Sequence, residues 1–313
     1  MVTQSGQGEQ MGAGEQQDAR QGPGQKTPRW THEMLMNMDR RFIFVVIAIA
    51  VAAPLIFPLN LPVRSSREAE AYFNEMEKLQ PGDEIIFSFD YEPDTMAELD
   101  PMSVATLRHA FRKDVRVLAQ TTYAGGVGIA ERILRQVAQE YDKVYGEDYV
   151  FFGYNPDYSA TILRMGESIR SNYPTDHYHA PTDGIPLMKG VDCYDDIELL
   201  VTVTASALAE YWIIWAGGKY KQRIIAGNTA IQAVLIYPYY QAGQLAGFLG
   251  GLKGAAEYEK LIGVSGAGLL GMDAQSVAHL AIVCFIILGN IGFLIQKSRT
   301  KQTGGPRDSR QGG

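Results

Sequence analysis

The sequence predicts an α/β protein: a doubly wound, mostly parallel sheet of five or six strands, flanked by two transmembrane helices. Three observations support this prediction. Short apolar runs rich in β-branched and aromatic residues alternate with amphipathic stretches through the middle of the chain. The connections between them are short, as in parallel sheets that helices cover on both faces. A long, uncharged apolar segment stands near each end of the chain.

The first apolar segment predicts a transmembrane helix over residues 42–60. Its core, FIFVVIAIAVAAPLIFPL, carries no charge, and about eighteen helical residues extend ~27 Å, close to the hydrocarbon thickness of a bilayer. Pro54 and Pro58 are tolerable near the end of a membrane helix, because neighbouring groups can bond the freed carbonyls. The preceding region is far longer than the basic start of a cleaved signal peptide, so we expect a retained anchor.

The second apolar segment predicts a transmembrane helix over residues 275–295. Basic residues precede the first segment at Arg40 and Arg41 and follow the second in the tail 296–313, which carries a net charge of +4. Residues 64–273 contain 18 basic and 29 acidic residues, a net charge of −11. The flanking charges predict cytoplasmic termini and an extracytoplasmic middle domain. We expect a cell-membrane protein, in a bacterial inner membrane, with disordered tails over residues 1–41 and 296–313.

Between the two segments, strand and helix patterns alternate. Strands are predicted at 84–90, 115–122, 149–154, 197–204 and 223–229. Helices are predicted at 65–79, 97–113, 127–145, 159–169, 205–216 and 239–261. The run 231–237 is left open as a sixth strand or the start of the last helix. The polar, Pro-rich stretch 171–190 is predicted to be a long loop that serves as a lid or a contact surface.

The candidate ligand-binding residues follow from the predicted sheet. Ligands of open parallel sheets bind beyond the carboxyl ends of the strands. The residues there that are expected to bind a ligand are Asp90, Tyr91, Glu92, Thr122, Tyr123, Gly125, Gly126, Tyr154 and Asn155. No catalytic residue, metal ligand or cofactor is assigned from the sequence.

The stretch SFDYEPDT (88–95) permits an enzymatic alternative. Asp90 directly after a strand, Glu92 two residues later and Thr95 resemble, in part, the haloacid-dehalogenase-type phosphohydrolases, whose nucleophilic Asp works with Mg²⁺. The match departs from that pattern: position 92 is Glu, Thr95 stands one place late, and no carboxylate pair follows a later strand. In the non-catalytic interpretation, Asp94 or Thr95 caps a turn that Pro93 fixes.

Two further motifs leave alternatives open. The turn in TTYAGGVGIAER (121–132) could bind an anion through its backbone N–H groups, or its glycines could only permit a tight turn. His177 and His179 in TDHYHAPTDG (175–184) could share a metal ion or lie in a solvated loop. Cys193 and Cys284 are not expected to form a disulfide.

These observations predict a membrane-anchored extracytoplasmic domain that acts as a binding or assembly component of a membrane complex. Expected partners are the lipid bilayer, other membrane-protein subunits or further copies of the chain, and a small polar ligand. The acidic domain argues against nucleic acid, whose phosphates it would repel. The alternatives are a Mg²⁺-dependent envelope phosphohydrolase using Asp90 and Glu92, and a small-solute-binding sensor. The sequence leaves open whether the protein is an enzyme.

Overall fold

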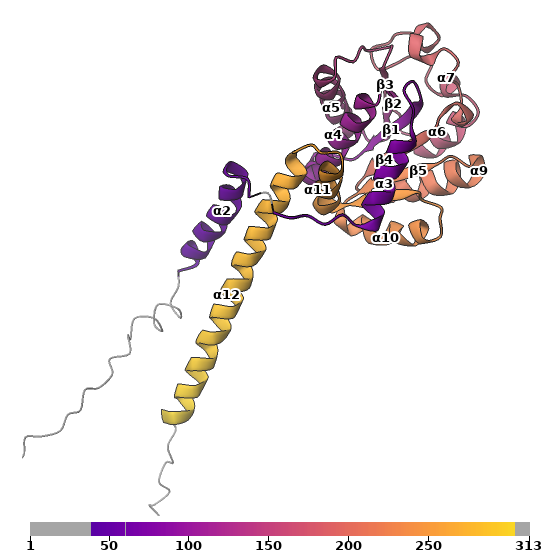
Figure 1. The fold of residues 1–313 in the computed structure, drawn as a ribbon. Helices are drawn as coiled ribbons and strands as arrows, with labels where there is room; N and C mark the ends of the chain where they lie inside the picture. Colours follow the sequence, from indigo (N-terminus) through magenta and orange to yellow (C-terminus); the bar gives the residue numbers. More distant parts are fainter. Residues whose placement is uncertain (1–38, 60, 304–313) are drawn as a thin grey trace, which may run out of the picture. The chain divides into compact units, whose positions relative to one another are not determined.

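The computed structural model describes residues 39–59 and 61–303. Its centre is a six-stranded parallel sheet with strand order β3-β2-β1-β4-β5-β6 (Figure 1). The strands are β1 (Glu84–Asp90), β2 (Arg116–Thr121), β3 (Tyr149–Tyr154), β4 (Leu199–Thr204), β5 (Ile224–Asn228) and β6 (Gly247–Gly250). The order reverses between β1 and β4, so the predicted doubly wound α/β architecture is confirmed.

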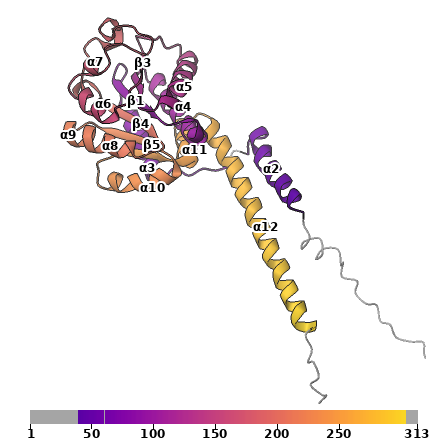
Figure 2. The same ribbon diagram turned by 180° about the vertical axis from the view of Figure 1, so that it is seen from behind.

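Helices connect the strands. The α-helices between the two apolar segments are α3 (Arg67–Lys78), α4 (Met96–Arg112), α5 (Val127–Glu140), α6 (Tyr158–Met165), α7 (Ile169–Asn172), α8 (Leu208–Tyr211), α9 (Gly218–Tyr220), α10 (Ala230–Gln241) and α11 (Gly251–Leu261). A π-helical segment, η6 (Trp212–Gly217), joins α8 to α9. Short 3₁₀ turns are η1 (Pro93–Thr95), η2 (Ala124–Gly126), η3 (Thr182–Gly184), η4 (Pro186–Met188) and η5 (Tyr194–Asp196). Helices lie on both faces of the sheet (Figures 1 and 2).

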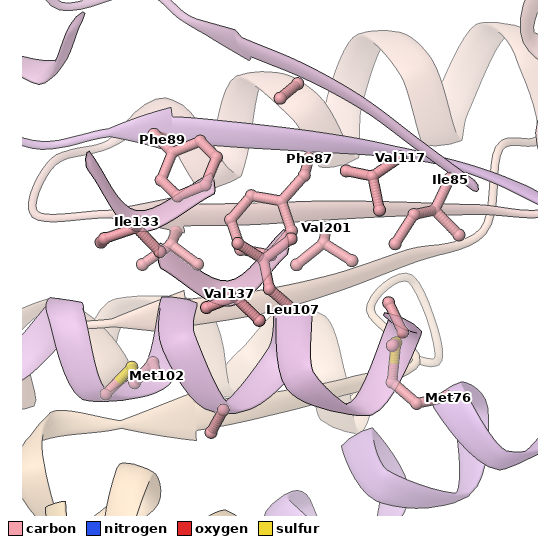
Figure 3. Packing of buried hydrophobic residues seen from close by; sticks show 14 of the residues in the cluster. Met76, Ile85, Phe87, Phe89, Met102, Leu107, Val117, Ile133, Val137 and Val201 are labelled. Atoms are coloured by element: carbon pink, nitrogen blue, oxygen red, sulfur yellow. The ribbon is translucent and has the colours of Figure 1, made fainter. Parts of the chain in front are cut away.

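Side chains of β1 contribute to two separate hydrophobic cores, because successive side chains of a strand point to opposite faces of the sheet. Phe87 and Phe89 belong to one cluster, together with residues of α3, α4, α5 and α11 (Figure 3). Ile86 belongs to the other, together with residues of α6, η6 and the long β3–β4 connection. Ser88 and Asp90 lie on that second face and are fully buried. A polar network therefore lies inside the second core.

The region 230–261 differs from the prediction. Instead of one long helix over 239–261, the chain forms α10, strand β6 and α11, and the run 231–237 is helical rather than a sixth strand. The reason lies in close approach: a Cβ on Gly247 would stand 2.3 Å from the Tyr72 backbone nitrogen on α3. The spacing of the glycines in this region suggests helix–helix packing. In the structure, Gly247 instead allows the edge strand β6 to contact helix α3.

The two apolar segments are both helical, as α2 (Arg40–Ile56) and α12 (Ala267–Thr303). Among the described residues, Ala267–Ile295 is the stretch whose length and composition suit a membrane crossing. Its apolar side chains are widely exposed, for example Leu280 at 64% and Phe293 at 59%. The second predicted span is thus confirmed as a helix that could cross a membrane. The 17-residue α2 is shorter, and its crossing stays a prediction.

Candidate functional site: a crevice at the switch point

A crevice opens at the carboxyl ends of β2 and β4, on either side of the central strand β1. Its volume is about 300 Å³, at the lower end of the range for small-molecule sites. The lining residues are Thr122, Tyr123, Tyr158, Ser206, Ala207, Leu208 and Tyr211. Neighbouring connections diverge at this point, because the strand order reverses between β1 and β4. Five of the lining side chains carry hydroxyl groups, and none carries a charge.

Behind this crevice lies Asp90, the last residue of β1, with no exposed surface. Its Oδ1 accepts the Thr122 backbone N–H at 3.0 Å and the Thr122 hydroxyl at 2.8 Å. Its Oδ2 accepts the Ser88 hydroxyl at 2.5 Å, the Trp212 indole N–H at 3.2 Å and the Thr202 hydroxyl at 3.4 Å. One carboxylate therefore holds β2, β4 and η6 together around the crevice.

The burial of Asp90 and its hydrogen bonds act on its pKa in opposite directions. Burial raises the pKa above the ordinary value, and donors from Ser88, Thr122 and Trp212 oppose that rise. The four side chains that hydrogen-bond to the carboxyl group all donate to it, so the acceptor form is the one that this geometry fits. Both oxygens are engaged, and Asp90 acts as a fixed acceptor that orients the crevice wall.

The polar network continues on both sides of Asp90. Ser88 also accepts from the Gln120 amide at 3.1 Å, and Gln120 accepts from the Tyr173 hydroxyl. The Thr204 hydroxyl donates to the Asp90 carbonyl at 2.9 Å and lies 3.1 Å from the Ser206 hydroxyl in the crevice lining. Satisfied buried networks of this kind fix side-chain positions. Thr122 and Ser206 are therefore presented to the crevice in defined orientations.

Stacked aromatic rings form one wall of the crevice. The ring centroids of Tyr158 and Tyr211 lie 5.1 Å apart at an interplanar angle of 29°, and those of Tyr211 and Trp215 lie 5.0 Å apart at 22°. The π-helical turn of η6 lets Trp212 face Asp90 while Trp215 joins this stack. The wall is apolar on its ring faces and carries hydroxyl groups at its edges.

The predicted site residues are only partly brought together. Thr122 and Tyr123 line the crevice, and Asp90 supports it. Tyr91 points to the opposite face, where its hydroxyl donates to Asp100 at 3.0 Å. Glu92 is exposed in the turn after β1. Tyr154 is 43% exposed and Asn155 bonds β2 through its backbone N–H, so both stand at the outer side of β2, away from the crevice lining.

The glycine-rich turn serves chain packing. A Cβ on Gly126 would lie 2.7 Å from the Thr121 hydroxyl and 2.9 Å from the Phe89 carbonyl, so only glycine fits there. Gly125 is exposed, and a Cβ added to it would contact the Glu92 side chain at 3.4 Å. The turn after β1, where dinucleotide-binding folds hold a pyrophosphate, has no glycine and carries Glu92 and Asp94. These carboxylates would repel a phosphate.

Sequence reasoning missed the aromatic half of the crevice. Ser206 stands two positions after the end of β4, and the rule that ligands bind beyond strand ends points to it. Tyr158 and Tyr211 lie on helices from two different connections, and no local signal relates them. Asn228, at the end of β5, is fully buried, and its Oδ1 has no hydrogen-bond partner among the described residues. It leaves an acceptor available at this edge of the sheet.

The other candidate features are less suited to a small ligand. A larger hollow of about 760 Å³ opens near the amino end of β5, but its Arg223 is paired with Glu75. In the described part of the chain, no group of three His, Cys, Asp or Glu side chains could hold a metal ion. His177 packs on the Phe151 ring with centroids 4.9 Å apart, and His179 is exposed with a φ of 66°.

Comparisons with known proteins yield little beyond this geometry. No family model matches the chain, and no curated protein matches it. Among solved structures, it is similar to AibC at 13% identity and a TM-score of 0.30, over 71% of this chain and 54% of that one. It is also similar to a UDP-N-acetylglucosamine 2-epimerase described as putative, from Listeria monocytogenes, at 10% identity and a TM-score of 0.28, over 58% of this chain and 43% of that one. The chain thus spans about half the length of these proteins, and similarities this low carry no argument about function.

Proposed function

We propose that this protein is a membrane-anchored binding component whose α/β domain holds a small uncharged ligand in the switch-point crevice. The observation that carries the proposal is the crevice lining: five hydroxyl groups, two of them fixed through Asp90, beside a stacked aromatic wall. The ligand class that fits combines hydroxyl or carbonyl groups with a planar or apolar face, as monosaccharides and nucleosides do.

Electrostatics favours an uncharged ligand. No cation lines the crevice, whereas Glu92 and Asp94 lie in the adjoining turn and residues 64–273 carry a net charge of −11. Repulsion from these carboxylates therefore disfavours an anionic ligand. The same geometry favours binding over phosphohydrolysis, because a nucleophilic Asp90 would have to reach the substrate, and its side chain is fully buried.

We place the domain outside the cytoplasm as part of this proposal. Its support is the charge distribution: Arg40 and Arg41 before α2, and the basic tail after α12. An enzyme reporter inserted in the exposed loop at Asp183 should be active only when the domain is exported. Activity of a cytosol-only reporter at the same position would contradict this topology.

The ligand proposal is tested with the full-length chain in lipid nanodiscs. Thermal unfolding is measured with a panel of monosaccharides and nucleosides, and with the corresponding sugar phosphates and nucleotides as charged counterparts. We expect uncharged compounds to raise the unfolding temperature. Ala207→Trp, which fills the crevice, should abolish the effect, and Ala180→Trp, at an exposed alanine outside the lining, should preserve it. A response that survives Ala207→Trp, or that appears only with charged compounds, would reject the crevice as an uncharged-ligand site.

A further inference from the structure

Helix α10 presents an apolar stripe to its surroundings. Its twelve residues, AIQAVLIYPYYQ, include no charged side chain. Ile231 is 81% exposed, Val234 72% and Leu235 54%. Positions three and four apart share one helical face, so these side chains form a single outward stripe, while Ile236 is buried. A water-facing helix shows the reverse arrangement, with its polar side outward.

Hydrogen bonds within residues 44–283 fix where the chain approaches this stripe. The Asp273 carboxylate, near the start of α12, accepts the backbone N–H groups of Leu59 at 3.0 Å and Leu61 at 3.1 Å. Lys260 on α11 donates to the Val63 carbonyl. The segment that follows α2 is therefore held against α11 and the first turns of α12.

The segment that follows α2 continues to Ser66, which lies beside α10. Ser66 lines a groove of about 370 Å³ together with Val234 and Tyr237. Leu61 and Ser66 are five positions apart in the chain, and a fully extended chain covers at most ~18 Å over that length. The groove beside the stripe is thus reached by at most ~18 Å of chain from Leu61, which is bonded to Asp273 near the start of α12.

The chemistry of the stripe favours the apolar part of a bilayer surface as its partner. Helices that bind anionic headgroups by charge carry Lys or Arg on their polar face, and α10 carries neither. Its exposed Ile, Val and Leu side chains match the boundary between headgroups and acyl chains. Tyr237 near its carboxyl end, 39% exposed, is of the type that is enriched at membrane–water interfaces.

We propose that α10 is an interfacial membrane helix, which inserts Ile231, Val234 and Leu235 into the surface of the bilayer that α12 crosses. The domain is then attached to lipid along its β5–β6 side as well as through its anchor. This inference rests on α12 spanning a membrane and is independent of the ligand proposed for the crevice.

Nitroxide labels test the proposal in the full-length chain, with Cys193→Ser and Cys284→Ala as background, reconstituted in phosphatidylcholine–phosphatidylglycerol nanodiscs. One label is placed at Val234→Cys and the matched one at Val144→Cys, an exposed valine (51%) between α5 and β3. We expect the label at 234 to collide several-fold more with dissolved oxygen than with a water-soluble nickel chelate. The label at 144 should show the opposite preference.

Two outcomes would overturn the proposal. One is equal accessibility of both labels to the nickel chelate, which would place α10 in water. The other is a short distance between the 234 labels of two copies that persists on dilution into excess lipid, which would show that a second copy covers the stripe. Circular dichroism of both labelled chains verifies that each is folded, so neither result can be attributed to unfolding.

Discussion

Thr122 donates both its backbone N–H and its hydroxyl to the same oxygen of Asp90, at 3.0 and 2.8 Å. This double hydrogen bond ties the end of β2 to the end of β1 where the strand order reverses. Asp90 also accepts a hydrogen bond from Trp212 on η6. Through Asp90, the segment after β2 on one side of the crevice is therefore connected to η6 on the other side. The position of Asp90 therefore determines the shape of the candidate binding site.

Asp90→Asn should destabilise the domain and weaken ligand binding. The amide has one acceptor where the carboxylate has two, and its N–H₂ would face donors from Ser88, Trp212 and Thr202. Leaving such buried groups unsatisfied costs about 1–3 kcal/mol. Urea unfolding of the full-length chain in mild detergent measures the change. The matched substitution Asp94→Asn, at an exposed carboxylate, should alter the free energy of unfolding by less than ~0.5 kcal/mol.

The same pair of variants separates binding from hydrolysis. If Asp90 were a nucleophile, the wild-type chain would show Mg²⁺-dependent phosphatase activity, which Asp90→Asn would lose and Asp94→Asn would keep. We expect no such activity in the wild type, measured by phosphate release from p-nitrophenyl phosphate. Detection of activity that depends on Asp90 would favour the phosphohydrolase.

Gly247→Ala should strongly destabilise the edge of the sheet. The new Cβ would stand 2.3 Å from the Tyr72 nitrogen and 2.6 Å from its Cα, and backbone atoms cannot rotate aside. We expect a loss of on the order of 1–3 kcal/mol from overpacking, seen as a lower urea midpoint. Gly128→Ala on α5 is the control: nothing lies within 4 Å of its Cβ position, so the helix should gain about 0.5–1 kcal/mol.

Stability should fall between pH 6.5 and pH 4 because of His109. This fully buried side chain accepts from the Tyr258 hydroxyl and donates to Glu77, each at 2.7 Å. Burial lowers the pKa of His109 from 6.5 to about 4, against the opposing charge of Glu77. Over this interval the unfolded chain binds a proton that the folded chain does not. The stabilisation is thus complete above pH 6.5 and is lost as the pH falls.

The difference between the pKa of His109 in the unfolded chain and in the folded chain corresponds to on the order of 3 kcal/mol in the free energy of unfolding. Urea unfolding at a series of pH values between 4 and 7 measures this dependence. His109→Gln removes the titrating group, so the variant should show a flatter profile over the same interval. An unchanged profile would mean that other groups, such as the carboxylates, account for the acid sensitivity.

Removing the Glu259 carboxylate should loosen the start of α12. Glu259 on α11 is 2% exposed and accepts the backbone N–H groups of Gly268 at 2.9 Å and Leu269 at 2.8 Å. Those N–H groups have no partner within the helix, so Glu259→Ala should cost about 1–3 kcal/mol locally. Hydrogen exchange over residues 264–272 should accelerate by roughly ten- to a hundredfold. Glu70→Ala, at an exposed position on α3, should leave exchange there unchanged.

The sequence by itself determined five of the six strands, β1 to β5, and most of the helices that cover the sheet. The short apolar run EIIFSFD, rich in β-preferring residues, predicts a strand over the range that β1 occupies, and the rule for parallel sheets points to Asp90, Thr122 and Tyr123 at strand ends. These signals are local, because side-chain periodicity reflects which face of an element is buried. The apolar composition of residues 275–295 likewise suffices to predict the membrane-compatible part of α12.

The tertiary structure alone decided the division of residues 230–261, the pairing of Tyr158 with Tyr211, and the burial of Asp90 in a network of donors. Each depends on groups far apart in the chain: β6 exists because Gly247 lies against Tyr72, and Asp90 is enclosed by residues up to 122 positions away. Propensity and spacing describe a residue and its near neighbours. The close contact of two backbones and the hydrogen bonding of a buried polar group depend on residues that are distant in the sequence. Only the folded chain brings those residues into contact.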